Sequence, residues 1–168
     1  MDVRARKEPG DEYPVKAEAE TPDNEAPGGP RPNSAGSNKA YGYAKFSYAD
    51  GQYEGNYVVK KHGVGRYIWG PPGSEGLRRE YNGDWKDDKI HGLGTYIWPE
   101  RRKYQGEWRD NNMHGIGLYS WANGNLYVGE YKYNQKHGYG IYKFSEDHLY
   151  MGFWKKGRAH GLSTILHC

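Results

Sequence analysis

The chain has 168 residues, enough for one modest domain and a tail, and its formal net charge of +3 is too small to indicate nucleic-acid binding by itself. Its 25 glycines and 17 tyrosines stand beside a hydrophobic share of only 35%, which excludes a thick two-layer core and favours a thin sheet. A single cysteine, Cys168, excludes a disulfide framework within the chain, and no apolar run approaches the ~18–20 residues that a membrane-spanning helix requires.

Residues 1–40 form a region of their own. They hold six of the nine prolines and one aromatic residue, Tyr13, and they contain no Ile, Leu, Phe or Trp. So little apolar surface cannot offset the entropy that is lost on ordering. The composition therefore predicts a disordered tail.

From residue 41 onward the chain repeats itself. A Tyr-x-Gly-x-Trp segment at 81–85 recurs 23 residues later at 104–108, and the His-Gly-x-Gly at 91–94 recurs at 114–117. Self-similarity at a fixed period is typical of a repeat architecture in which each unit covers its neighbour's apolar face. The array spans 41–168: a partial unit at 41–52 precedes units that start at Tyr53, Tyr81, Tyr104, Tyr127 and Tyr150, with an insertion loop at 70–80.

Each unit is predicted to be a β-hairpin. In both segments the marked residues are two apart, which puts them on one face of a strand, and several glycines per unit would defeat a helix at ~1 kcal/mol each. An aromatic ring can lie over a cross-strand glycine, so we expect Tyr81 and Trp85 to lie across Gly92 and Gly94. The predicted fold is all-β, an elongated single antiparallel sheet of stacked hairpins.

The recurring Tyr-x-Gly-x-Trp, polar turn and His-Gly-x-Gly-x-Tyr-x-Trp/Phe resemble the MORN repeat over residues 41–167. The resemblance implies a sheet of stacked hairpins without catalytic activity of its own. It also implies a docking surface, either an aromatic groove for a protein or a basic surface for anionic lipid. Members of this family occur in cilia, in cytoskeletal assemblies, at membranes and beside enzyme domains.

The repeated histidines do not indicate a metal site. They occupy one place in five units: His62, His91, His114, His137 and His160. Equivalent residues of adjacent hairpins lie two strands apart, about 10 Å, whereas zinc needs several nitrogens at about 2.1 Å. The chain also has no Gly-x-Ser-x-Gly elbow and no Gly-x-Gly-x-x-Gly loop opening a helix. We therefore expect no catalytic residue, no metal and no cofactor.

One aromatic row is the candidate partner site. It consists of Tyr96, Trp98, Tyr119, Trp121, Tyr142 and Phe144. A single-layer sheet cannot bury every ring, and exposed aromatic rows are good platforms for a helix or peptide. We expect this row to be exposed and to form a groove for a protein partner.

Two basic clusters are the candidate lipid contacts. They are Arg101, Arg102 and Lys103, and Lys155, Lys156 and Arg158. Basic clusters in turns can meet anionic lipid at ~1 kcal/mol per side chain. Nucleic acid is not expected, because the basic residues are interspersed with acidic ones.

These features favour a non-enzymatic scaffold that binds a protein partner. Two alternatives stay open: peripheral attachment to an anionic membrane, and a regulatory module of an enzyme whose catalytic part lies outside this chain. The single cysteine, and a start at Met1 without a secretory signal, favour the cytoplasm, including a cilium, the cytoskeleton or the cytoplasmic face of a membrane.

Overall fold

The computed structural model describes residues 41–48, 51–58, 60–70, 78–146 and 148–167. The predicted disordered tail, most of the insertion loop and Cys168 lie outside these residues. None of the described residues forms a helix, so none of them provides a helix that could span a membrane.

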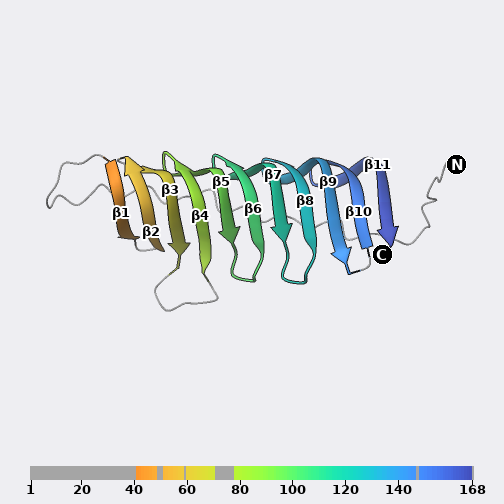
Figure 1. Cartoon of the computed structure of the whole chain (residues 1–168), viewed down its shortest axis with the longest axis horizontal. Coiled ribbons are helices and arrows are strands. Elements are labelled where there is room, and N and C mark those ends of the chain that lie inside the picture. The colour runs from red at the N-terminus through yellow and green to blue at the C-terminus, as the bar shows by residue number, and fades with distance from the viewer. Residues whose placement is uncertain (1–40, 49–50, 59, 71–77, 147, 168) are drawn as a thin grey trace.

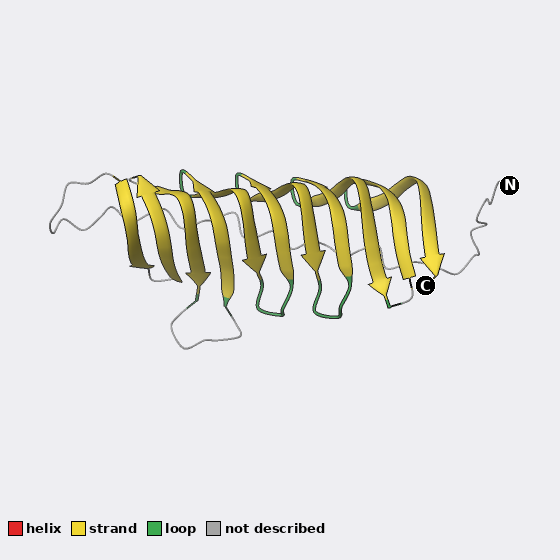
Figure 2. Ribbon diagram, viewed as in Figure 1, coloured by secondary structure: helices red, strands yellow, loops and turns green. Residues whose placement is uncertain are grey.

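The described residues form one open antiparallel sheet, with eleven strands paired in chain order (Figures 1 and 2). The strands are β1 (Tyr41–Tyr48), β2 (Gly51–Val58), β3 (Lys60–Trp69), β4 (Arg79–Lys86), β5 (Lys89–Ile97), β6 (Lys103–Arg109), β7 (Asn112–Ser120), β8 (Leu126–Lys132), β9 (Gln135–Ser145), β10 (His148–Lys155) and β11 (Arg158–His167). The predicted all-β sheet of stacked hairpins is confirmed.

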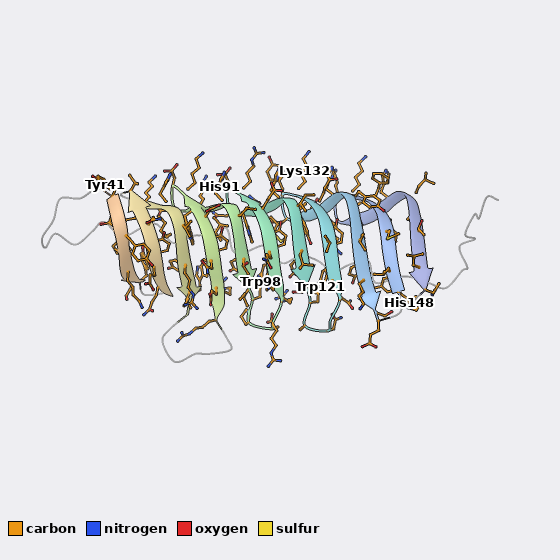
Figure 3. The ribbon with its side chains drawn as sticks, in the orientation of Figure 1. Tyr41, His91, Trp98, Trp121, Lys132 and His148 are labelled. Carbon is orange, nitrogen blue, oxygen red and sulfur yellow. The ribbon has the colours of Figure 1, made fainter. Side chains whose placement is uncertain are left out.

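The two edges of the sheet, where the strands begin and end, carry different connections. Two-residue turns join β4 to β5, β6 to β7, β8 to β9 and β10 to β11, and all their central residues have positive φ, as a type I′ turn requires. We call this the short-turn edge. Longer connections, such as 98–102 and 121–125, lie at the opposite, long-loop edge. Figure 3 shows His91 and Lys132 near the first edge and Trp98 and Trp121 near the second.

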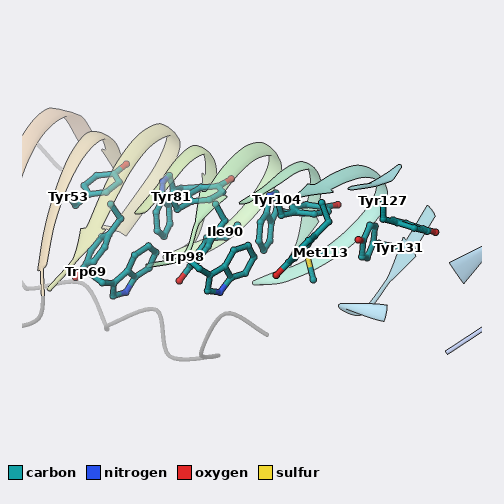
Figure 4. Close-up of a cluster of buried hydrophobic side chains, with 14 of the residues drawn as sticks. Tyr53, Trp69, Tyr81, Ile90, Trp98, Tyr104, Met113, Tyr127 and Tyr131 are labelled. Atoms are coloured by element: carbon teal, nitrogen blue, oxygen red, sulfur yellow. The ribbon is translucent and has the colours of Figure 1, made fainter. Parts of the chain in front are cut away.

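One face of the sheet, the inner face, holds a core made almost entirely of aromatic rings. Seven tyrosines on it are fully buried: Tyr53, Tyr67, Tyr81, Tyr96, Tyr104, Tyr119 and Tyr127. The strands curve rather than run straight, and the buried rings gather inside that curve (Figures 2 and 4). A single curved sheet therefore encloses rings that a flat sheet would leave in water.

Glycine makes room for these rings, though not at every predicted position. A Cβ on Gly94 would collide with the phenol ring of Tyr81, so the predicted packing of Tyr81 on Gly94 is confirmed. The prediction that Trp85 covers Gly92 is wrong. The ladder between β4 and β5 shifts after Gly83, so Trp85 pairs with Ile90, and its indole donates to the carbonyl of Gly65 at 3.0 Å.

Gly92 instead lies against an acidic side chain on the other face of the sheet, the outer face. It has a φ of +58° and contacts Asp84, whose carboxylate accepts a hydrogen bond from the amide of Leu93 at 2.8 Å. The same arrangement recurs one unit later, where Glu107 accepts from the amide of Ile116. These carboxylates stabilise the bulge in their own hairpins.

Candidate functional site

The predicted partner row lies on the inner face, but most of it is buried. Tyr96, Trp98, Tyr119 and Tyr142 are at most 6% exposed, so the expectation of an exposed row is wrong for them. The reason is tilted ring packing within and between units, for example 4.5 Å between the centroids of Tyr96 and Trp98 and 5.5 Å between those of Trp98 and Tyr119.

Two members of the row keep part of their surface in water. Trp121 and Phe144 are half-buried, and Trp121 borders an open depression at the long-loop edge. Glu100, Arg102, Ala122 and Asn123 complete its lining. Trp121 is therefore the member of the row that an outside group can reach through this depression.

One member of the first basic cluster, Arg102, borders the same depression. The guanidinium of Arg102 lies 5.9 Å from the ring of Trp98 and donates to the carboxylate of Glu100 at 2.6 Å. Both interactions hold Arg102 against the sheet. Neighbouring Arg101 is exposed, and Lys103 is half-buried at the start of β6.

The structure does not bring the two predicted basic clusters together. Lys155, Lys156 and Arg158 belong to the turn between β10 and β11, on the short-turn edge, whereas residues 101–103 lie on the long-loop edge. On the short-turn edge Lys155 belongs to a longer basic series, with one exposed residue in each of the last four hairpins: Lys86, Arg109, Lys132 and Lys155. The sequence signal for it is a Lys or Arg directly after the last four Tyr-x-Gly-x-Trp/Tyr segments, whereas Val58 follows the first.

Two lysines that the sequence analysis missed are buried in the aromatic core. Lys61 and Lys136 are 2% and 4% exposed and precede the repeated histidine of their units. The ammonium group of Lys61 lies 3.4 Å from the carboxylate of Asp88. The same position holds Ile90 and Met113 in the units between, so sequence pattern alone does not distinguish a buried cation from an apolar residue there.

Lys136 sits among four aromatic rings. Its ammonium lies between 4.3 and 5.0 Å from the ring centroids of Trp121, Tyr127, Tyr142 and Trp154. The turn residue opposite is Gly157 instead of an Asp, and among the described residues no carboxylate forms an ion pair with this lysine. Burial accordingly lowers the pKa of Lys136 from 10.5 to about 8.

Asparagine side chains in two of the turns link a hairpin to the one before it. The side-chain oxygen of Asn111 accepts from the backbone amide of Ile90 at 2.8 Å, while the backbone amide of Asn111 donates to the carbonyl of Ile90. Asn134 makes the same pair of bonds with Met113. These bonds join neighbouring hairpins at the short-turn edge, and their sequence signal is Asp or Asn as the second turn residue.

The repeated histidines lie along the short-turn edge as separate groups. The Nδ1 of His91 accepts from the amide of Asp110 at 3.4 Å, and His114 packs edge-on against the ring of Tyr133. Burial lowers the pKa of His114. In the part of the chain that the structure describes, no three His, Cys, Asp or Glu residues are placed to hold a metal ion.

The comparisons with known proteins agree with this geometry. The family model of the MORN repeat matches residues 53–71, 81–100, 104–126, 127–147 and 150–162, which is more than half of the chain. A comparison with curated proteins found no match. Each matched segment begins on the Tyr-x-Gly segment of a β-hairpin. The chain therefore belongs to the MORN-repeat family.

Proposed function

We propose that this MORN array is a non-enzymatic scaffold that binds a segment of another protein at the long-loop edge of its inner face. MORN repeats are known in protein-interaction and membrane-interaction modules, which supports a binding role. A cytoplasmic setting, in a ciliary or cytoskeletal assembly, belongs to the same proposal.

The observation that carries the proposal is the half-buried pair Trp121 and Phe144, of which Trp121 borders an open depression. Tyr142 packs against both rings, with centroids 5.5 and 5.8 Å away, so they are held in place before a partner arrives. Rigid aromatic side chains give a large contact area at a small entropic cost, which is why they dominate binding sites.

The chemistry around the pair indicates what the partner carries. An apolar side chain fits against Trp121, and Arg101, exposed in the loop that carries Glu100 and Arg102, offers a cation to an acidic group of the partner. Arg102 contributes less, because it is already paired with Glu100. We therefore infer a partner segment that combines apolar and acidic residues.

Site-specific photo-crosslinking in cells tests the proposal. A photoreactive phenylalanine analogue replaces Phe144 in one variant and Val64, on the outer face, in a matched control. We expect a defined cross-linked protein at position 144, lost when Trp121→Ser is added and retained with Trp121→Phe. Identical products at both positions, or products that do not depend on Trp121, would refute it.

Attachment to an anionic membrane is a second candidate, favoured by the basic series on the short-turn edge. Its members lie one per hairpin, about 10 Å apart, and each can contribute ~1 kcal/mol at an anionic surface.

Vesicle sedimentation at low and physiological salt tests this candidate. We expect binding to anionic but not neutral lipid, and its loss on the triple change Lys86→Gln, Arg109→Gln and Lys132→Gln. The matched control, Arg101→Gln with Lys103→Gln on the opposite edge, should still bind. Absence of binding to anionic vesicles at low salt would rule out attachment to an anionic membrane.

A further inference from the structure

The outer face of the sheet changes from polar to apolar partway along its length. Residues that pair across neighbouring strands form a row over the sheet. One such row begins with Asn82 on β4, Thr95 on β5 and Gln105 on β6. On the next four strands the paired residues in the same row are Leu118, Val128, Ile141 and Met151. Two-residue alternation places each of these side chains opposite the buried tyrosines.

A second row of large apolar residues lies beside the first. It contains Ile116 on β7, Tyr139 on β9 and Phe153 on β10, and the last two rings touch edge-on with centroids 5.5 Å apart. We define the outer apolar patch as Ile116, Leu118, Val128, Tyr139, Ile141, Met151 and Phe153. Five of its seven members are between 38% and 55% exposed.

Together with three leucines at its margins, this patch exposes the apolar area of a protein interface. At about 200 Å² for each fully exposed large side chain, its five exposed members contribute roughly 470 Å², and Leu126, Leu162 and Leu166 at the margins raise the total to roughly 800 Å². The largest apolar patch on a monomer is usually about 300–600 Å², whereas one partner of a standard interface buries about 800 Å². The area fits one side of a stable dimer.

We propose that the outer apolar patch packs against the same patch of a second copy of this chain. An isologous contact is the commonest way in which identical chains associate, and two sheet faces pack well at about 10 Å. The polar row at Asn82, Thr95 and Gln105 limits the contact to the β7–β10 half. A second copy displaced along the sheet would place its apolar rows on these polar residues.

Charge at the patch opposes an anionic lipid surface as the occupant. Glu130 pairs across the ladder with Ile116 and is exposed, and Glu107 lies on the preceding strand, also exposed. Carboxylates at this level would meet the lipid phosphates directly. Glu130 lies within the second row, between Ile116 and Tyr139, and its carboxylate already accepts a hydrogen bond from the amide of Tyr139 at 3.1 Å, so a second copy of the sheet can cover it without leaving it unpaired.

The repeat supplies substitutions that its own fold already tolerates. Val128 occupies the repeat position that Gln105 holds one unit earlier, and Ile141 occupies the position that Thr95 holds two units earlier. The test variant is therefore Val128→Gln with Ile141→Thr. The matched control, on the polar half, is Gln105→Ser with Thr95→Ser.

Sedimentation velocity of the full chain, from about 1 to about 100 µM, measures the association. We expect a wild-type dimer, a dissociation constant at least about tenfold higher in the test variant, and an unchanged control. Far-UV circular dichroism and the melting temperature confirm that each variant folds.

Two outcomes would overturn the proposal. A wild-type chain that stays monomeric throughout leaves the patch to another partner or to lipid. A test variant that dimerises as the wild type does assigns the association to a different surface, such as the exposed edge strand β11. Neither outcome bears on the site at Trp121 and Phe144, which is on the opposite face.

Discussion

Replacing Lys136 with methionine should stabilise the protein. The equivalent residue one unit earlier is Met113, which is fully buried, so the fold accepts methionine at this position. The change removes a cation that lies among four rings and, within the described residues, forms no ion pair. The change in the free energy of unfolding is positive if the desolvation cost of the ammonium group is larger than its attraction to the rings, and negative if it is smaller.

The magnitude follows from the pKa of Lys136. A value lowered from 10.5 to about 8 means that keeping the charge in the fold costs about 3 kcal/mol, at ~1.36 kcal/mol per pH unit. Cation–π attraction in a desolvated site offsets about 2 kcal/mol of that cost. We expect Lys136→Met to raise the free energy of unfolding by about 1–3 kcal/mol at pH 7.

The wild type should also become more stable as pH rises from 8 to about 9. Below pH 8 Lys136 is protonated in both the folded and the unfolded chain, so the cost of burying its charge lowers stability in full. Above pH 8 the folded chain releases the proton, whereas the unfolded lysine keeps it up to about 10.5, so the unfolded state binds more protons. Burial raises the pKa of the neighbouring Tyr127 and Tyr142 in the folded chain, so these tyrosines lower stability only as pH approaches 10, where they ionise in the unfolded chain.

Urea unfolding at pH 7, 8, 9 and 9.5, followed by tryptophan fluorescence, checks both expectations. The matched control is Lys61→Met at the same repeat position, which should destabilise by about 2 kcal/mol because it removes the ammonium partner of Asp88. The reasoning is refuted if Lys136→Met lowers stability at pH 7, or if the wild type shows no rise above pH 8.

Three further changes test how the hairpins pack, each by the shift in the urea midpoint. Gly117→Ala drives a Cβ into the ring of Tyr104 and should cost about 2–3 kcal/mol. Gly124→Ala, at a φ of +89° in open space, should cost only about 1 kcal/mol, and equal losses would contradict the packing argument. Asn111→Ala strips the buried amide of Ile90 of its acceptor and should cost about 1–3 kcal/mol, whereas Asn111→Asp, which copies Asp88, should be tolerated. Trp85→Phe removes the indole bond to Gly65 and should cost about 1 kcal/mol, and an unchanged midpoint would mean that this bond does not join the hairpins.

The repeat pattern was sufficient to predict the sheet. Strand side chains alternate with a period of two, so the spacing of Tyr81, Gly83 and Trp85 decided which residues share a face. The fixed period gave the number and order of the hairpins, because each unit pairs with its sequence neighbours. The packing of Tyr81 on Gly94 followed from the same register.

The one-residue shift in each hairpin was beyond such reasoning. A bulge after Gly83 moves Trp85 from its own hairpin onto the one before it. No residue type in the segment indicates that shift, because the same sequence is compatible with a regular ladder.

The surfaces were decided by the tertiary structure. Alternation assigns Trp98 and Trp121 to one face, yet the packing in the folded sheet leaves the first buried and the second half-buried. Arg101 and Lys155 carry the same charge, and their separation onto opposite edges depends on which connection each one occupies. Val128 and Ile141 are far apart in the chain and become neighbours only through strand pairing. Sequence fixes local periodicity, whereas exposure and surface adjacency depend on register and curvature summed over many strands.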